Sequence, residues 1–194
     1  MSEEDEGATA LLAAVSMNDL DRGKRLMRNV NVNDIVHSEA SLHAEPLFFK
    51  AALCDGAPVW MRAMLEVGAD PMARANDDDT LLHKMAGSGV QSLDRFAVIR
   101  SLVEAGAEVN AKDDKGQTPL DRAIAMTARM FRNARDSRNH DSPELLVSMA
   151  VIDFLEANGA TMAKRESREL VREVRQRAKQ ELSVGRSGGA SPAR

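Results

Sequence analysis

The chain has 194 residues, of which 43% are hydrophobic and 29% are charged, and its formal net charge is −4. This length suits one globular domain or one repeat array, and the composition lies well outside the disordered class. The net charge excludes a molecule that binds polyanions with its whole surface. Aromatic residues make up only 3%, whereas Met occurs 11 times, which favours closely stacked helices over a β-sandwich.

The chain begins with an acidic stretch, residues 1–7, which has neither the basic start nor the apolar core of a signal peptide. We expect this stretch to be disordered. No apolar run approaches the roughly 20 residues needed to span a bilayer. The single cysteine, Cys54, excludes an internal disulfide, and its apolar helical surroundings favour a buried, inert thiol. We therefore expect a cytoplasmic protein that has no membrane partner.

Three segments further along the chain end alike, each as an apolar run that closes on glycine: Gly68, Gly106 and Gly159. Glycine adopts the left-handed conformation of a helix C-cap without a steric penalty, so each position marks the end of a helix. Trp60 precedes Gly68 by the same interval at which Val98 precedes Gly106, which is a core position of a second helix. We therefore expect Trp60 in the core, although Trp also serves as an interface anchor.

The starts of the helices repeat as well. Thr80 opens the sequence TLLH and Thr118 opens TPLD, and both follow polar turns. Thr caps exposed backbone N–H groups, and Pro suits the first helical position because its missing N–H would be unpaired there. Thr80 and Thr118 are 38 residues apart, as are Gly68 and Gly106, so two landmarks give one spacing.

At these positions the chain resembles the ankyrin repeat, whose motifs Thr-Pro-Leu-His-x-Ala and Gly-Ala-Asp-Val-Asn are both present in degraded form. The resemblance covers about residues 8–160 and implies an all-α solenoid of stacked helix–turn–helix units with β-turn tips. Because the family period is roughly 33 residues, about five residues are inserted near residues 90–94. By the same measure, the last repeat carries an insertion of about 20 residues.

We place the four repeats at about residues 8–35, 36–74, 75–112 and 113–162. The first repeat lacks the Gly-Ala pair, so we expect Asn29 to take the left-handed C-cap. The register of the second is open by a residue or two, because Phe48 and Phe49 sit where the family has His. Residues 163–183 carry an apolar stripe at helical spacing, which predicts an amphipathic capping helix. The Gly- and Ser-rich residues 184–194 are expected to be disordered.

The sequence shows no pattern typical of a catalytic or metal site. No pair of histidines has helical metal-site spacing with a carboxylate. His83 occupies the Thr-x-x-His position, where the resemblance implies a hydrogen bond that holds the turn. The run from Asp77 to Asp79 lacks the alternating ligands of a calcium loop, so we expect solvated or helix-capping carboxylates. Without a phosphate loop or an activated nucleophile, we expect no enzyme, no cofactor and no small-molecule substrate.

The resemblance implies that the protein binds another, folded protein through a concave surface made of turn tips and first helices. Binding would itself be the output, as inhibition, scaffolding or neutralisation of the kind performed by bacterial immunity proteins. Carried over onto this chain, the expected contacts at the tips are Asn33, Asp34, His37, Arg74, Asn76, Asp77, Asp78, Lys112, Asp114 and Lys115.

The insertion in the last repeat adds further expected contacts. Arg129, Arg132, Arg135 and Arg138 recur every three residues. Two interpretations stay open for them, namely a solvated extension of the helix and an arm that pairs with carboxylates or phosphates.

An alternative function is a nucleic-acid-associated regulator that uses this basic insertion and the C-terminal helix. Residues 163–194 carry a net charge of +5, with nine basic and four acidic residues. However, glutamates are interleaved with the basic residues and no aromatic residue accompanies them for base stacking, which disfavours nucleic acid as the partner. A monomer that binds a partner protein is the favoured interpretation.

Overall fold

The structure is a computed structural model that describes residues 3–36, 45–75, 77–89, 92–137 and 143–187. Nine helices occupy most of these described residues: α1 (Glu3–Ser16), α2 (Leu20–Leu26), α3 (Leu47–Ala51), α4 (Ala57–Glu66), α5 (Leu81–Ala86), α6 (Leu93–Glu104), α7 (Pro119–Ser137), α8 (Pro143–Ala157) and α9 (Arg165–Ser187). The strands β1 (Ile35–Val36) and β2 (Glu45–Pro46) pair in antiparallel fashion. An isolated antiparallel bridge joins Arg74 to Thr80.

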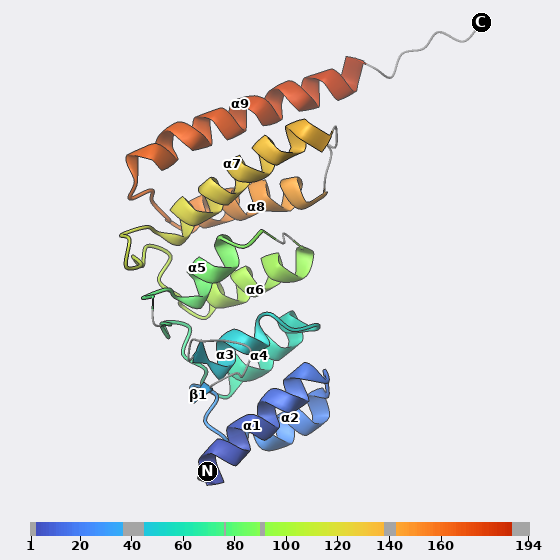
Figure 1. Ribbon diagram of the computed structural model, residues 1–194, viewed down its shortest axis with the longest axis vertical. Helices are drawn as coiled ribbons and strands as arrows, with labels where there is room; N and C mark the ends of the chain where they lie inside the picture. Colours follow the sequence, from blue (N-terminus) through green and yellow to red (C-terminus); the bar gives the residue numbers. More distant parts are fainter. Residues whose placement is uncertain (1–2, 37–44, 76, 90–91, 138–142, 188–194) are drawn as a thin grey trace, which may run out of the picture.

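The first eight helices form four pairs that follow one another along the long axis of the molecule (Figure 1). First helices pack on first helices, α1 on α3 and α5 on α7, whereas among the second helices α4 packs on α6 and α6 on α8. The molecule therefore has one layer of first helices and one of second helices. α9 packs against α7 at the end of the stack. The loops that lead from one pair to the next, which we call the turn tips, gather along one edge.

The predicted helix starts are confirmed. The Thr80 side chain accepts a bond from the backbone N–H of His83, while the His83 ring nitrogen Nδ1 accepts one from the Thr80 N–H at 3.2 Å. The other ring nitrogen of His83 bonds the carbonyl of Gln117 at 3.0 Å, which ties one pair to the next turn tip. Thr118 likewise accepts from the N–H of Asp121 at 3.2 Å. His83 is thus a structural residue, as predicted.

The predicted helix ends are confirmed for the three glycines. Gly68, Gly106 and Gly159 have φ angles of +96°, +93° and +83°, in the left-handed region that favours glycine. No heavy atom lies within 4 Å of the position that a Cβ would take at any of the three. Backbone conformation rather than space therefore requires glycine there.

The prediction for Asn29 is wrong. The left-handed asparagine of the first pair is Asn18, which follows α1 with a φ angle of +53°. After α2 the chain instead makes a further helical turn, in which the N–H of Val30 donates to the carbonyl of Leu26 at 3.1 Å. Asn18 is held in place because its Oδ1 accepts a hydrogen bond from the indole Nε1 of Trp60 at 3.0 Å.

Trp60 lies in the core, as predicted, and is fully buried. Its ring lies against Gly23 on α2, where a Cβ would come within 2.3 Å of two ring atoms. Glycine is therefore required on α2 by this close approach, not by its backbone conformation. The rest of the core consists mainly of Ala, Leu, Met, Ile and Val side chains, which lets the helices approach closely.

The structure fixes the register of the second repeat. α3 begins after Pro46 as α5 begins after Thr80. Phe49 therefore takes the place of His83, and both side chains are buried. A register one residue earlier, with Phe48 in that place, is the one that the Glu-Pro-Leu-Phe sequence suggests. Pro46 provides no side-chain cap, so no capping residue in the sequence marks where α3 begins.

The ends of the chain differ from expectation. α1 begins at Glu3, so residues 3–7 are helical rather than disordered. Acidic side chains in a first turn interact favourably with the positive end of the helix dipole, which explains a start inside the acidic stretch. α9 continues to Ser187 and so takes in residues 184–187 as well. Within the described part of the chain, no helix combines the length and the apolar character needed to cross a membrane.

Candidate functional site

The turn tips are joined to one another by side chains that the sequence placed in the binding site. Asn33 donates from Nδ2 to the carbonyl of Gly68 at 3.0 Å. Its Oδ1 accepts from the backbone N–H of Asp70 at 2.7 Å. Both amide atoms of Asn33 are therefore engaged in holding the next tip, which makes it a structural residue.

The same connection recurs at the later tips. Asn110 donates to the carbonyl of Gly159 at 3.0 Å and accepts from the N–H of Thr161 at 2.7 Å. Between them, Met72 occupies the equivalent place, and its sulfur accepts from the N–H of Glu108 at 3.2 Å. A thioether is a weak acceptor and has no donor, so the middle connection lacks half of the bonding that its neighbours have.

Arg74, another expected contact, also connects two tips. One guanidinium nitrogen donates to the carbonyl of Asp78 at 2.8 Å and to that of Lys112 at 2.9 Å. The Asp78 carboxylate lies 3.8 Å from the same nitrogen. Because these bonds fix the side chain along the tips, Arg74 serves the scaffold.

Asp79 was expected to be solvated or to cap a helix, and this expectation is wrong. Its side chain is only 2% exposed and accepts two parallel bonds from Arg122, at 2.8 Å from Nη1 and 2.6 Å from Nη2. Arg122 also donates from Nε to Asp113 at 2.9 Å. One guanidinium of α7 thus joins carboxylates from two successive tips. Asp79 precedes Arg122 by 43 residues, so no local pattern announces the pair.

Asp79 and Asp113, the two carboxylates that bind Arg122, have pKa values that are shifted in opposite directions. Burial raises the pKa of Asp79 to about 6, and the nearby charges of Asp77 and Asp113 act in the same direction against Arg122. Burial also disfavours the ionised form of Asp113. Hydrogen bonds from Gln117 and Arg122 outweigh it and lower the pKa of Asp113 below its usual value.

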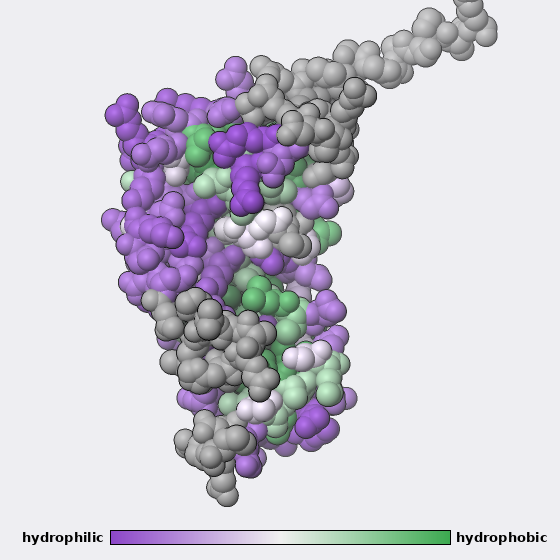
Figure 2. Space-filling model, in the orientation of Figure 1, coloured by the Kyte–Doolittle hydropathy of each residue, from purple (hydrophilic) through white to green (hydrophobic). Residues whose placement is uncertain are grey.

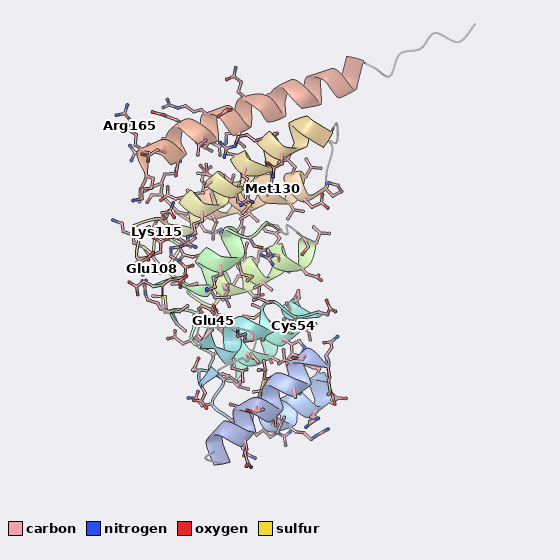
Figure 3. All side chains as sticks on the ribbon, in the orientation of Figure 1. Glu45, Cys54, Glu108, Lys115, Met130 and Arg165 are labelled. Atoms are coloured by element: carbon pink, nitrogen blue, oxygen red, sulfur yellow. The ribbon has the colours of Figure 1, made fainter. Side chains whose placement is uncertain are left out.

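A cation recurs four residues after the N-cap of three first helices, as Lys50, Lys84 and Arg122. The Lys50 and Lys84 ammonium groups lie 3.1 Å and 2.9 Å from the carboxylate of Glu45. Figure 3 shows Glu45 beside α3. Lys84 also pairs with Asp77 at 3.8 Å. All three cations are therefore neutralised within the scaffold.

Two of the expected contacts come together at a depression between α5 and α7. It has a volume of about 260 Å³ and is lined by Gly87, Lys115, Gln117, Arg122, Ala125, Met126 and Arg129. We call it the Lys115–Arg129 groove. Lys115 lies on a turn tip (Figure 3) and Arg129 on α7, and both are exposed. Among the described residues, neither has an ion-pair partner.

The other expected contacts do not join this groove. Asp34 accepts from the side chain of Asn31 at 2.8 Å, while Lys112 and Asp114 are exposed on a tip. Arg132 is exposed on α7, which continues through the insertion as far as Ser137. Of the remaining expected contacts, His37, Asn76 and Arg138 lie outside the described residues, and for Arg135 only the backbone is described.

The sequence did not point to the small residues that line the groove. Gly87 and Ala125 each lie seven residues after the N-cap of a first helix, the position that Leu53 occupies outside the groove. The signal that could have revealed them is the change from a large to a small side chain at this position, which is readable only once the register is known. Across the described residues, no three His, Cys, Asp or Glu side chains gather as metal ligands would.

A family model described as ankyrin repeats in many copies matches residues 82–129. Residues 82–129 are ankyrin repeats. The matched segment contains every residue that lines the Lys115–Arg129 groove. Ankyrin repeats generally mediate protein–protein interaction and are typically non-catalytic.

Two curated relatives are potassium channels of Arabidopsis thaliana. The chain is 31% identical to potassium channel SKOR over 100 residues, which is 50% of this chain and 12% of the channel. It is 30% identical to potassium channel GORK over 96 residues, which is 49% of this chain and 11% of the channel. The chain thus spans only a small part of the length of either relative.

Proposed function

We propose that this chain is a non-catalytic module that binds a partner protein through its first helices and turn tips. The observation that carries the proposal is the exposure of large apolar side chains in the turns that directly follow two first helices. Leu53 is 57% exposed after α3, and Met17 is 72% exposed after α1. Figure 2 shows apolar surface near the turn between α3 and α4. Exposed apolar side chains that gather on one face are typical of interaction surfaces.

The architecture that supports this surface is an ankyrin solenoid closed by α9. The four pairs supply the extended face, as stacked repeats do. α9 contributes Val171 and Val174, which are buried, the latter with Phe131 of α7 and Leu145 of α8. We propose that α9 caps the stack, because the last repeat has no following repeat to cover its apolar side. Its exposed outer side, which includes Arg165 (Figure 3), is charged.

Binding is then the output of the molecule. In this proposal the chain inhibits its partner, neutralises it in the manner of a bacterial immunity protein, or scaffolds it. All three outcomes require one stable surface and no catalytic group.

The proposal is tested by capture of the partner from a lysate of the source organism, with Leu53→Asp compared with Leu146→Asp. Leu146 is a matched control, since it is 61% exposed but lies on the second helix α8. We expect wild type and Leu146→Asp to retain the same protein, identified by mass spectrometry, and Leu53→Asp to lose it. Equal capture by both variants would contradict the proposed face, and absence of any specific protein with wild type would contradict the function.

A further inference from the structure

We propose that the Lys115–Arg129 groove receives an acidic segment of the partner protein. In this arrangement a carboxylate of the partner lies between Lys115 and Arg129, and an adjoining apolar side chain packs on Ala125 and Met126. The inference rests on the proposed function and deepens it, because it assigns the chemistry of the partner segment at one place on the binding face.

Of the three cations that line the groove, one is bound within the scaffold and two lie on the surface. Arg122 is committed to Asp79 and Asp113, with four bonds to their carboxylates. Lys115 and Arg129 are exposed and form no ion pair in the part of the chain that the structure describes. The two carboxylates that bind Arg122 are therefore already used. Two free cations on its rim attract an anion, and a guanidinium binds a carboxylate through two parallel bonds.

The absence of a side chain at position 87 lets Arg122 approach the end of α5 closely. A Cβ at Gly87 would lie 3.3 Å from both Cβ and Cδ of Arg122 and 3.2 Å from the carbonyl oxygen of His83. Gly87 thus lets the aliphatic stem of Arg122 lie across the end of α5 on its way to Asp79. At the equivalent position the neighbouring first helices carry Leu53 and Ala125. The stem of Arg122 forms the floor, which the paired charges of its head hold rigid.

The size and lining of the groove suit side chains of a protein. Its volume of about 260 Å³ lies below the roughly 300–1,000 Å³ of sites that enclose small-molecule ligands. Ala125 is exposed and Met126 half-buried, and a thioether adapts its shape to an apolar neighbour. None of the described residues that line it is aromatic, so the groove offers no ring on which a nucleobase would stack.

The inference is tested by NMR titration of the ¹⁵N-labelled full chain with three synthetic heptapeptides. One alternates Asp with Leu, the second has Asn in place of Asp, and the third has Lys. We expect only the Asp peptide to shift the amide signals of Lys115, Gln117 and Arg129. Its affinity should fall as NaCl rises from about 50 mM to about 500 mM, because salt screens exposed charges.

Charge reversal provides the matched comparison. The double variant Lys115→Glu with Arg129→Glu should bind the Asp peptide at least about tenfold more weakly, because two rim attractions become repulsions. Lys24→Glu with Arg62→Glu changes the net charge equally at exposed positions of α2 and α4 and should leave the affinity unchanged. Arg129→Lys, which keeps the charge, should retain most of the binding. Unchanged thermal unfolding in all variants shows that the scaffold is intact.

Three outcomes overturn the inference. One is Asp-peptide binding that survives the Lys115 and Arg129 reversal or maps to another surface. The second is a larger response of the same signals to a short DNA duplex than to the peptide, which assigns the groove to polyanions. The third is no peptide binding while Leu53→Asp still abolishes partner capture. In this case the proposed function stands without the groove, whereas absence of capture by wild type contradicts the function itself.

Discussion

At the scale of single residues, the turn tips are held by a bond pattern in which one member is chemically weaker than the others. Asn33 and Asn110 each use a donor and an acceptor to hold the following tip. Met72 provides only a sulfur acceptor for Glu108. Replacement by the residue found at both neighbours should therefore strengthen the structure.

We predict that Met72→Asn raises the free energy of unfolding by about 0.5–1.5 kcal/mol, the usual net contribution of a hydrogen bond. The new amide would accept from Glu108 and donate to the carbonyl of Gly106, as its neighbours do. Urea denaturation followed by circular dichroism measures the change. Asn110→Ala should move the midpoint the other way, and a Met72→Asn protein less stable than wild type would contradict the proposed equivalence.

The raised pKa of the Asp79 carboxyl group leads to a second prediction for a single residue. Because burial raises its pKa in the folded chain to about 6, the folded state holds a proton between about pH 4 and 6 that the unfolded state has released. Its contribution to stability is therefore present below about pH 4 and is lost as the pH rises through about 6.

Asp79→Asn should remove this loss, on the order of 3 kcal/mol, so that stability depends less steeply on pH in that range. The measurement is urea denaturation of both proteins at several pH values between 4 and 7. Asp113 has a lowered pKa and acts with the opposite sign, but it is present in both proteins. A variant whose pH profile runs parallel to that of wild type would contradict the assignment.

At the scale of elements, the helix boundaries that carry a local signal are those that the sequence predicts. The caps at Thr80 and Thr118 and the left-handed Gly106 depend on residues next to one another in the chain. α3 follows Pro46, which makes no side-chain cap bond, so its register had to come from the structure. The same limit applies to the site, because Gly87 follows α5 and Arg129 lies on α7, and the two meet only after the pairs stack.

We predict that Gly106→Val lowers the stability by on the order of 1 kcal/mol or more, because a β-branched residue is strained at a φ angle of +93°. Nothing lies within 4 Å of its Cβ position, so the loss comes from the backbone alone. Gly89→Ala is a suitable control, since its Cβ would make an ordinary contact of 3.8 Å with Met126. Thermal unfolding should show a lower midpoint for the first variant and little change for the second.

At the scale of the whole molecule, we expect the end of the stack to depend on α9. Val174 is 2% exposed in a cluster with Ala128, Phe131 and Leu145, which come from α7 and α8. The larger core runs through all four pairs and also takes in Val171 of α9, next to this smaller cluster. The sequence predicts the apolar stripe of α9, but which helices it covers follows only from the structure.

We predict that Val174→Asp lowers the free energy of unfolding by about 2–4 kcal/mol, because an unpaired carboxyl group would be buried. The conservative variant Val174→Ala should cost less. Urea denaturation followed by circular dichroism measures both. If Val174→Asp is as stable as wild type, α9 does not close the stack.

Trp60 of α4 is buried against Gly23 of α2, so two spectroscopic signals can follow different parts of this protein. The chain has one Trp and no Tyr, so its near-ultraviolet emission reports the first two helix pairs alone, while circular dichroism averages over all of them. In the Val174→Asp protein, the emission should stay native at urea concentrations where part of the helical signal is already lost. The gap between the two transitions would measure how far a disturbance at one end of the stack travels toward the other.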